Sequence, residues 1–190
     1  MLIPDQILQI IEKNYPTGSL RNKIYMPHCQ AVTGLALKIA MAHPELNADK
    51  EMLLFGGMLH DIGIRFTDAP DIGCFGPLPY IAHGYKGREL LEKEGLVQFA
   101  PVCERHIGVG ISLEDIKKNN LPVPLRDMTP QTIEEKIICY ADKFYSKSAT
   151  NLLQPKPIEK VRKSIRKHGE DKRKIFDEMM ELFGTEHVYR

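Results

Sequence analysis

The spacing of apolar residues is the feature that most constrains how this chain folds. Apolar positions recur at steps of three and four residues through several windows, while no stretch shows sustained alternation with β-branched residues. The clearest case is a stripe formed by Ile133, Ile137, Ala141 and Phe144. This periodicity predicts an all-α fold.

Proline, glycine and capping residues divide the periodic stretches into separate helices. Pro27 suits the first turn of the second helix, and Thr129-Pro130 suits the start of the strongest one. The segment 63–82 has no periodicity, and loops of this length are often functional, so we expect a lid over a site there. We predict helices over residues 4–14, 27–42, 50–61, 83–94, 97–105 and 130–148, a further helix starting at Ser112, and more helix after Lys156.

The length of the chain, 190 residues, favours one domain with an appendage. We expect residues 1–150 to form the main domain and residues 151–190 to form a basic helical appendage packed on it. The appendage holds nine Lys and Arg residues between positions 156 and 174. Such a run could face phosphates, but a solvated amphipathic helix is the commoner explanation.

The charge balance of the chain limits its partners. Lys and Arg total 26 and Asp and Glu total 25, so no global field attracts nucleic acid or an anionic membrane. The longest apolar run, residues 53–59, is too short to cross a bilayer, and the N-terminus lacks the features of a secretory signal. The four cysteines are scattered without any C-x-x-C pair, which suits a reducing compartment. We therefore expect a cytoplasmic protein without a membrane partner, and we do not expect nucleic acid as a partner.

Three predicted helices each direct ligand-type side chains toward the core. His60 and Asp61 end the apolar helix over 50–61, His28 lies one turn before an apolar position, and Asp142 lies at the margin of the core stripe. Burying an unpaired carboxylate is costly. A divalent metal ion explains this convergence, because it neutralises carboxylates and accepts neutral imidazole nitrogen. Taken singly, each residue could instead be a cap or a histidine bonded to the backbone.

The order of these residues resembles a known family. A histidine, then His60-Asp61-Ile62-Gly63 about 30 residues later, then a distant aspartate on a helix is similar to the signature of the HD superfamily of metal-dependent phosphohydrolases, in its H-D-I-G variant. The resemblance covers about residues 23–148 and implies an HD-domain helical bundle. It also implies that four residues hold one metal ion, namely His28, His60, Asp61 and Asp142.

Two more histidines extend the resemblance. His83 opens one predicted helix and His106 ends the next, and both fall between Asp61 and Asp142 in the chain. Their positions are similar to those that carry a second metal in dinuclear HD proteins, where the carboxylate matching Asp61 bridges the ions. The resemblance thus favours a dinuclear site. Alternatively, His83 is a cap or lid residue and His106 is a cation that complements a helix C-terminus.

The resemblance implies hydrolysis of a phosphate ester or anhydride of a small, nucleotide-like substrate. One or two divalent ions of Fe, Mn, Zn or Co suit the nitrogen and oxygen ligands. We expect Asp61 to orient the attacking water, and Arg65 and Lys143 to stabilise charge on the phosphoryl group. Position 64 is Ile where the cyclic-dinucleotide phosphodiesterases carry Lys, and their Gly-Tyr-Pro motif does not follow His106, which argues against cyclic dinucleotides.

Two alternatives to hydrolysis stay open. A few dinuclear HD proteins use iron to activate oxygen, and a third possibility is a catalytically idle, metal-stabilised binding module. The presence of six ligand candidates argues against an idle domain. Cys29 and Cys139 are expected to be small buried hydrophobes, and the remaining histidines, His43, His168 and His187, are expected at the surface.

Overall fold

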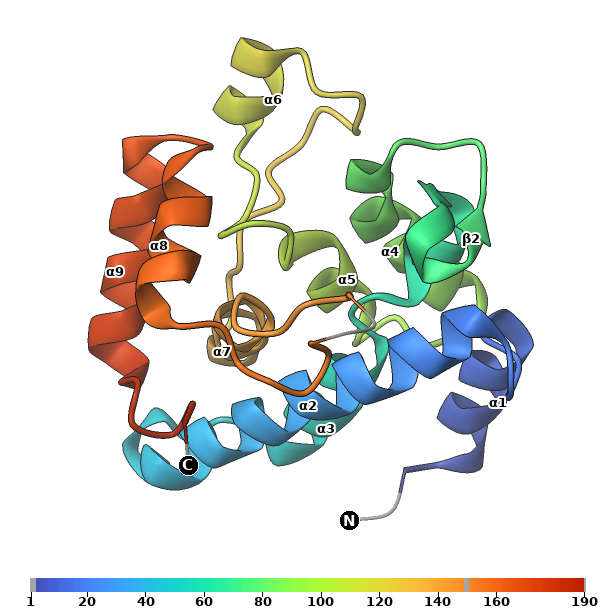
Figure 1. Cartoon of the computed structure of the whole chain (residues 1–190), viewed down its shortest axis with the longest axis horizontal. Coiled ribbons are helices and arrows are strands. Elements are labelled where there is room, and N and C mark those ends of the chain that lie inside the picture. The colour runs from blue at the N-terminus through green and yellow to red at the C-terminus, as the bar shows by residue number, and fades with distance from the viewer. Residues whose placement is uncertain (1–2, 149–150, 190) are drawn as a thin grey trace.

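Helices make up most of the chain, which confirms the all-α prediction. The structure is a computed structural model that describes residues 3–148 and 151–189. Figure 1 shows α7 almost end-on in the middle of the molecule, with α2 and α3 below it, α4 and α5 on one side and α8 and α9 on the other. In chain order the helices are α1 (Asp5–Asn14), α2 (Leu20–Ala42), α3 (Lys50–Leu59), α4 (His83–Lys93), α5 (Ala100–Arg105), α6 (Leu113–Asn119), α7 (Ile133–Asp142), α8 (Ile158–Arg166) and α9 (Glu170–Phe183).

The segment 63–82 is more ordered than its lack of periodicity predicts. Ile72 and Cys74 within it are buried in the same apolar core as α1 and α3. Short 3₁₀ turns and one two-residue antiparallel pair satisfy its backbone, so it is a packed connection. The elements here and in the preceding connection are η1 (Pro44–Leu46), η2 (Ile62–Phe66), β1 (Asp68–Ala69), η3 (Pro70–Ile72), β2 (Cys74–Phe75) and η4 (Tyr80–Ala82).

The second helix starts earlier than predicted. Ser19 caps α2 by accepting a hydrogen bond from the backbone N–H of Asn22, so the helix begins at Leu20 and Pro27 lies in its interior. The prediction of Pro27 in the first turn was therefore wrong. A proline inside a helix removes one backbone hydrogen bond, and here that interruption immediately precedes His28.

The strongest predicted helix is shorter than expected at both ends. Thr132 caps α7 and forms a capping box with Glu135, so the helix starts at Ile133 and not at Thr129-Pro130. It ends at Asp142, which leaves the following residues in an irregular segment. The predicted start at Ser112 is confirmed, with Asp115 completing the capping box there.

The two C-terminal helices share a core with the rest of the bundle. Val161 of α8 and Phe176 and Phe183 of α9 pack in one apolar cluster with residues of α2 and α7. Much of their basic charge is paired, as in the ion pair between Arg162 and Asp177 (2.8 Å). Among the described residues, none of the helices combines the length and the apolar character that crossing a membrane requires.

Candidate metal centre

Glycine at two positions lets the elements that carry the site approach closely. A Cβ on Gly57 of α3 would lie 2.4 Å from Oγ1 of Thr33 on α2, and one on Gly63 would lie 2.0 Å from the carbonyl oxygen of His83. Neither position has space for a side chain. The first contact brings His60 beside His28 of α2, and the second brings α4, and with it His83, against the turn that follows Asp61.

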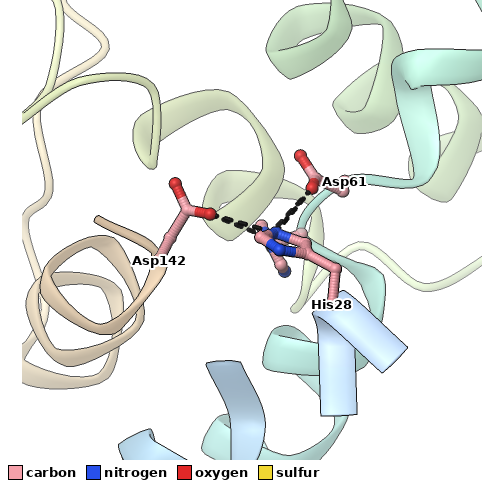
Figure 2. Close-up of side chains that lie close together, drawn as sticks. His28, Asp61 and Asp142 are labelled. Atoms are coloured by element: carbon pink, nitrogen blue, oxygen red, sulfur yellow. Dashed lines mark ion pairs between the residues drawn. The ribbon is translucent and has the colours of Figure 1, made fainter. Parts of the chain in front are cut away.

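Asp61 lies at the middle of the site and is fully buried. Its Oδ2 atom faces a group formed by His28, His60 and Asp142, which we call the Oδ2 side. Figure 2 shows His28 and Asp142 of this group beside Asp61. His28 Nε2 lies 3.1 Å from both Asp61 Oδ2 and Asp142 Oδ1, and His60 Nε2 lies 3.3 Å from Asp61 Oδ2. Each of the four residues offers one ligand atom within 4.8 Å of the others.

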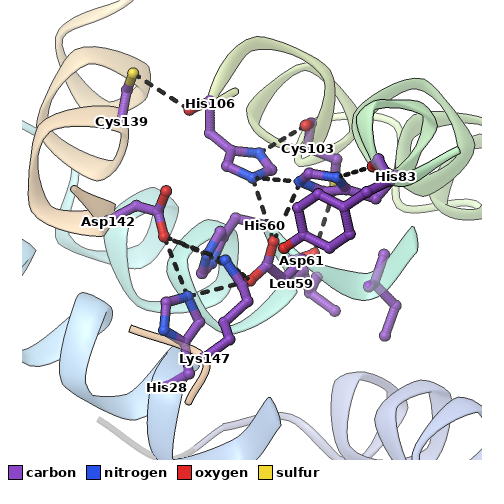
Figure 3. A network of polar contacts seen from close by, with 12 residues as sticks. His28, Leu59, His60, Asp61, His83, Cys103, His106, Cys139, Asp142 and Lys147 are labelled. Atoms are coloured by element: carbon purple, nitrogen blue, oxygen red, sulfur yellow. Dashed lines mark hydrogen bonds and ion pairs between the residues drawn. The ribbon is translucent and has the colours of Figure 1, made fainter. Parts of the chain in front are cut away.

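The other carboxylate oxygen of Asp61 faces a second group, His83 and His106, which we call the Oδ1 side (Figure 3). Asp61 Oδ1 lies 3.5 Å from His83 Nε2 and 3.3 Å from His106 Nε2. The structure thus brings all six predicted ligands together around one carboxylate. The two oxygens of Asp61 serve different groups, as a bridging carboxylate would.

The protonation of the Oδ1 side shows that it suits a cation. His83 Nδ1 contacts the carbonyl oxygen of Tyr80 (2.5 Å) and His106 Nδ1 contacts that of Cys103 (2.7 Å), so each Nδ1 is the donor. Burial together with His106 lowers the pKa of His83 to about 3, and burial also lowers the pKa of His106. Both rings are therefore neutral, and their Nε2 lone pairs face each other at 3.1 Å beside Asp61. A metal ion bound by these atoms would remove that repulsion.

The Oδ2 side also fits a cation. His60 Nδ1 donates to the carbonyl oxygen of Gly57 (2.6 Å), which directs Nε2 toward the carboxylates. His60 Nε2 and Oδ1 of Asp142 are shielded from solvent and have no hydrogen-bond partner among the described residues, and the oxygens of Asp61 have none apart from an ion pair with Lys147. Buried polar atoms of this kind need a partner.

Lys147 enters the Oδ2 side and was not predicted from the sequence. Its Nζ atom lies 2.8 Å from Asp61 Oδ2 and 3.6 Å from Asp142 Oδ1 (Figure 3). Burial lowers the pKa of a lysine, but Asp142 and Asp61 outweigh burial and hold the pKa of Lys147 well above its usual value. Burial raises the pKa of Asp61, but Lys147 and His60 outweigh it and hold that pKa well below its usual range.

The predicted cations occupy different surroundings. Lys143 lies at the site, where its Nζ contacts Asp142 Oδ2 (2.7 Å) and the carbonyl oxygen of His106 (3.0 Å). Arg65 points elsewhere, because its guanidinium donates to Oδ1 of Asn14 on α1 (2.5 Å). The structure therefore brings Lys143, but not Arg65, to the six ligands.

Residues beside the ligands brace the elements that carry them. Tyr15 donates from its hydroxyl toward the carbonyl oxygens of Asp61 and Ile62 (both 3.1 Å), which ties the turn to the end of α1. Arg105, next to His106, donates to Glu135 of α7 (2.9 Å). These contacts join distant segments, and no local sequence signal identifies them.

Two cavities adjoin the centre. One has a volume of about 280 Å³ and is lined by Asp142 and three lysines, Lys143, Lys147 and Lys156. The other has a volume of about 530 Å³ and lies on the His83 side, where isoleucine, valine and leucine side chains form much of its wall. Tyr80 lines both cavities.

An all-α bundle with a buried histidine and aspartate centre of this order defines an HD-type protein, and comparison with known proteins agrees. The model of the HD domain family matches residues 25–147. The chain therefore belongs to the HD domain family. All six candidate ligands lie within the matched residues.

Individual relatives are similar over parts of their length. An uncharacterized protein of Methanocaldococcus jannaschii is 37% identical over 118 residues, which span 60% of this chain and 62% of that protein. A tRNA (cytidine(56)-2'-O)-methyltransferase of Picrophilus torridus is 32% identical over 143 residues, which span 75% of this chain but 36% of the enzyme.

One solved structure shares the fold. The HD domain of the phosphodiesterase PgpH from L. monocytogenes aligns with a TM-score of 0.53, covering 94% of this chain and 97% of that domain, at 16% identity. At this identity the likeness concerns the fold alone.

Proposed function

We propose that this protein is a metal-dependent hydrolase that cleaves phosphate esters or anhydrides of a small, nucleotide-like substrate. His28, His60 and Asp142 would hold one divalent ion with Oδ2 of Asp61, and His83 and His106 would hold a second ion with Oδ1. When bound, such ions supply Lewis acidity toward phosphoryl oxygens and increase the acidity of water.

The charge of the centre is the observation that carries this proposal. The carboxylates of Asp61 and Asp142 are already matched by the ammonium groups of Lys143 and Lys147, which lie within 2.8 Å of them. Divalent ions held by the histidines would therefore leave a buried, net positive site. Such a site needs an anionic ligand, and a phosphoryl group has the required charge and acceptor atoms.

The two cavities support a substrate with two unlike ends. The smaller one, with Lys143, Lys147 and Lys156 in its wall, suits phosphate oxygens. The larger, mostly apolar one suits a flat or apolar body such as a nucleobase. Because Tyr80 lines both, a molecule that fills the two cavities would pass beside the centre.

The residues of this chain would have separate roles in orienting water, stabilising charge and binding the phosphate. Asp61 would accept a hydrogen bond from the attacking water and orient it. Lys143 and Lys147 would stabilise negative charge that develops on the phosphoryl oxygens, since preorganised cations favour the transition state. Lys156 lies at the cavity wall, where its Nζ donates to the carbonyl oxygen of Lys143 (3.0 Å), and would bind the phosphate without taking part in the reaction.

A substrate screen tests the proposal. The metal-reconstituted protein is incubated with nucleoside mono-, di- and triphosphates, sugar phosphates and, because of the methyltransferase relative, tRNA. Release of phosphate or of a shortened nucleotide, equal in air and under nitrogen, is expected. Turnover that requires oxygen would favour an iron oxygenase, and no turnover with any phosphorylated compound would overturn the hydrolase assignment.

A matched pair of variants tests the anion pocket. Lys156→Gln is expected to raise KM several-fold with little change in kcat, because it removes binding charge from the pocket wall. Lys163→Gln is the control, since Lys163 is an exposed lysine of α8 outside the pocket. An equal KM for both variants would show that the phosphate binds elsewhere.

A further inference from the structure

A second group of metal-ligand side chains lies away from Asp61, where the C-terminal tail meets the end of α2. Figure 1 shows the tail that follows α9 beside this end of α2. His43, Glu186 and His187 each offer one ligand atom there, and the three atoms lie within 4.8 Å of one another. Two segments from opposite ends of the chain thus converge on one point.

The histidine rings are oriented as metal ligands are. His43 Nδ1 lies 2.9 Å from Glu45 Oε1, so Nδ1 is the donor and the lone pair of Nε2 faces the tail. A carboxylate that holds the far nitrogen of a histidine is a common feature of zinc sites. The His43 and His187 rings meet edge to face with their centroids 5.7 Å apart.

The nitrogen atoms that face the group lack partners. The Nε2 atoms of His43 and His187 are both shielded from solvent, and neither makes a hydrogen bond to a described residue. His187 Nε2 lies 3.2 Å from Glu186 Oε1. The side chains of His43 and His187 are 23% and 19% exposed, so both histidines are partly covered by their neighbours. Shielded, unpaired imidazole nitrogens beside a carboxylate need a cation or a proton.

We propose that His43, Glu186 and His187 bind a zinc-type divalent ion at a site separate from the catalytic centre. Two imidazole nitrogens and one carboxylate oxygen form a set that Zn²⁺ accepts, with its fourth position left to water. The site would fasten the tail to the bundle, where Val188 is already buried and the Tyr140 hydroxyl donates to the carbonyl oxygen of Gly184 (2.8 Å). Its role would be structural.

Zinc titration of the full chain and of matched variants tests this site. The zinc content after dialysis is measured for the parent, His187→Ala, His43→Gln and the control His168→Ala, whose exposed histidine lies outside both metal groups. The parent and the control are expected to bind one more ion per chain than His187→Ala and His43→Gln, whatever number the Asp61 centre holds. Because ions that bind only the folded state stabilise it, the Tm of the parent should also rise further with zinc.

Equal zinc content in all four proteins, or an equal zinc-dependent rise in Tm, would overturn the proposal. Phosphatase activity separates this outcome from failure at the catalytic centre, since His187→Ala should keep the activity of the parent. Hydrogen exchange in the tail gives an independent measurement. Zinc should slow exchange of residues 184–189 in the parent and leave it unchanged in His187→Ala, and no effect of zinc on the parent would also contradict the proposal.

Discussion

The two sides of Asp61 differ in charge more than in ligand number. The Oδ2 side holds a second carboxylate, Asp142, and a buried ammonium group, Lys147. The Oδ1 side holds only the neutral imidazoles of His83 and His106. An ion on the Oδ2 side would therefore have a second carboxylate as a ligand but also an ammonium group beside it, whereas an ion on the Oδ1 side would have Asp61 as its one carboxylate ligand.

The elements that carry the two sides also differ. The Oδ2 side is built on α2, α3 and α7, which pack against one another at the middle of the bundle. The Oδ1 side depends on α4 and the end of α5, and these reach Asp61 through the close contact at Gly63 and through the ion pair of Arg105 with Glu135. Within residues 3–148 and 151–189, Asp61 is the one residue shared by both groups of the centre. A substitution of Asp61 should therefore affect ion binding on both sides, whereas a substitution of any other ligand candidate should affect one side.

Asp61→Asn should have the largest effect, because it removes charge from both sides at once. We expect loss of both ions at stoichiometric metal concentration and a fall in turnover of about 10³-fold or more. Metal content by elemental analysis and phosphate release measure the two effects. A variant that keeps full metal content and full turnover would show that the centre lies elsewhere.

His106→Gln should affect the Oδ1 side alone. We expect one ion at the Asp61 centre instead of two and a loss of turnover of about 10²-fold, because displacement at phosphorus benefits from a second cation. His28, His60 and Asp142 still surround Oδ2 of Asp61 in this variant, so the remaining ion should bind as in the parent. Isothermal titration of the parent and of His106→Gln with Mn²⁺ measures how many ions each protein binds. Saturation of the parent at one ion would leave a mononuclear site.

Acid should weaken the Oδ1 side of the metal-free protein in a defined pH range. The pKa of His83 is lowered to about 3 and that of His106 is also lowered, so the unfolded chain binds protons near pH 6.5 while the folded chain does not. The free energy of unfolding should therefore fall as the pH drops from about 6.5 toward 3, by roughly 2–5 kcal/mol. Urea unfolding at several pH values measures it.

The variant His83→Gln is the matched test of that assignment. It removes a group whose pKa is lowered to about 3, so the stability of this variant should depend less on pH between 6.5 and 3. An unchanged pH dependence would show that other groups dominate acid unfolding.

Periodicity predicted most helices because it reports burial directly, and its errors have local causes. The interior position of Pro27 was missed because Ser19 supplies an earlier cap, and the start of α7 was missed because Thr132 and Glu135 form a better capping box than Thr129. The packing of the segment 63–82 was not predicted, because packing without periodicity leaves no signal in the sequence. Its order comes from burial of Ile72 and Cys74 against distant helices.

The candidate ligands were found because their order along the chain matches a family pattern, whereas Lys147 was not found. Lys147 lies beyond the end of α7, in an irregular segment whose path is set by tertiary contacts. Helical spacing therefore could not place its ammonium group beside Asp61. Arg65 shows the converse, because it lies close to Asp61 in the sequence while its guanidinium donates to Asn14 of α1.

Arg65→Ala should have the smallest effect and belongs to neither side. The guanidinium donates to Asn14, and the backbone N–H of Arg65 donates to the Tyr15 hydroxyl (3.1 Å), so the residue joins η2 to the end of α1. Loss of the side-chain bond should lower the free energy of unfolding by about 1 kcal/mol, because buried Asn14 loses a charged donor. Metal content and kcat should change less than twofold, since no contact of Arg65 reaches the six ligands. The conservative Arg65→Lys should recover part of the stability, as a lysine can still donate to Asn14.

If Arg65→Ala instead raises KM strongly at unchanged stability, the side chain must turn toward the phosphate when substrate binds, and the anion pocket would extend past η2.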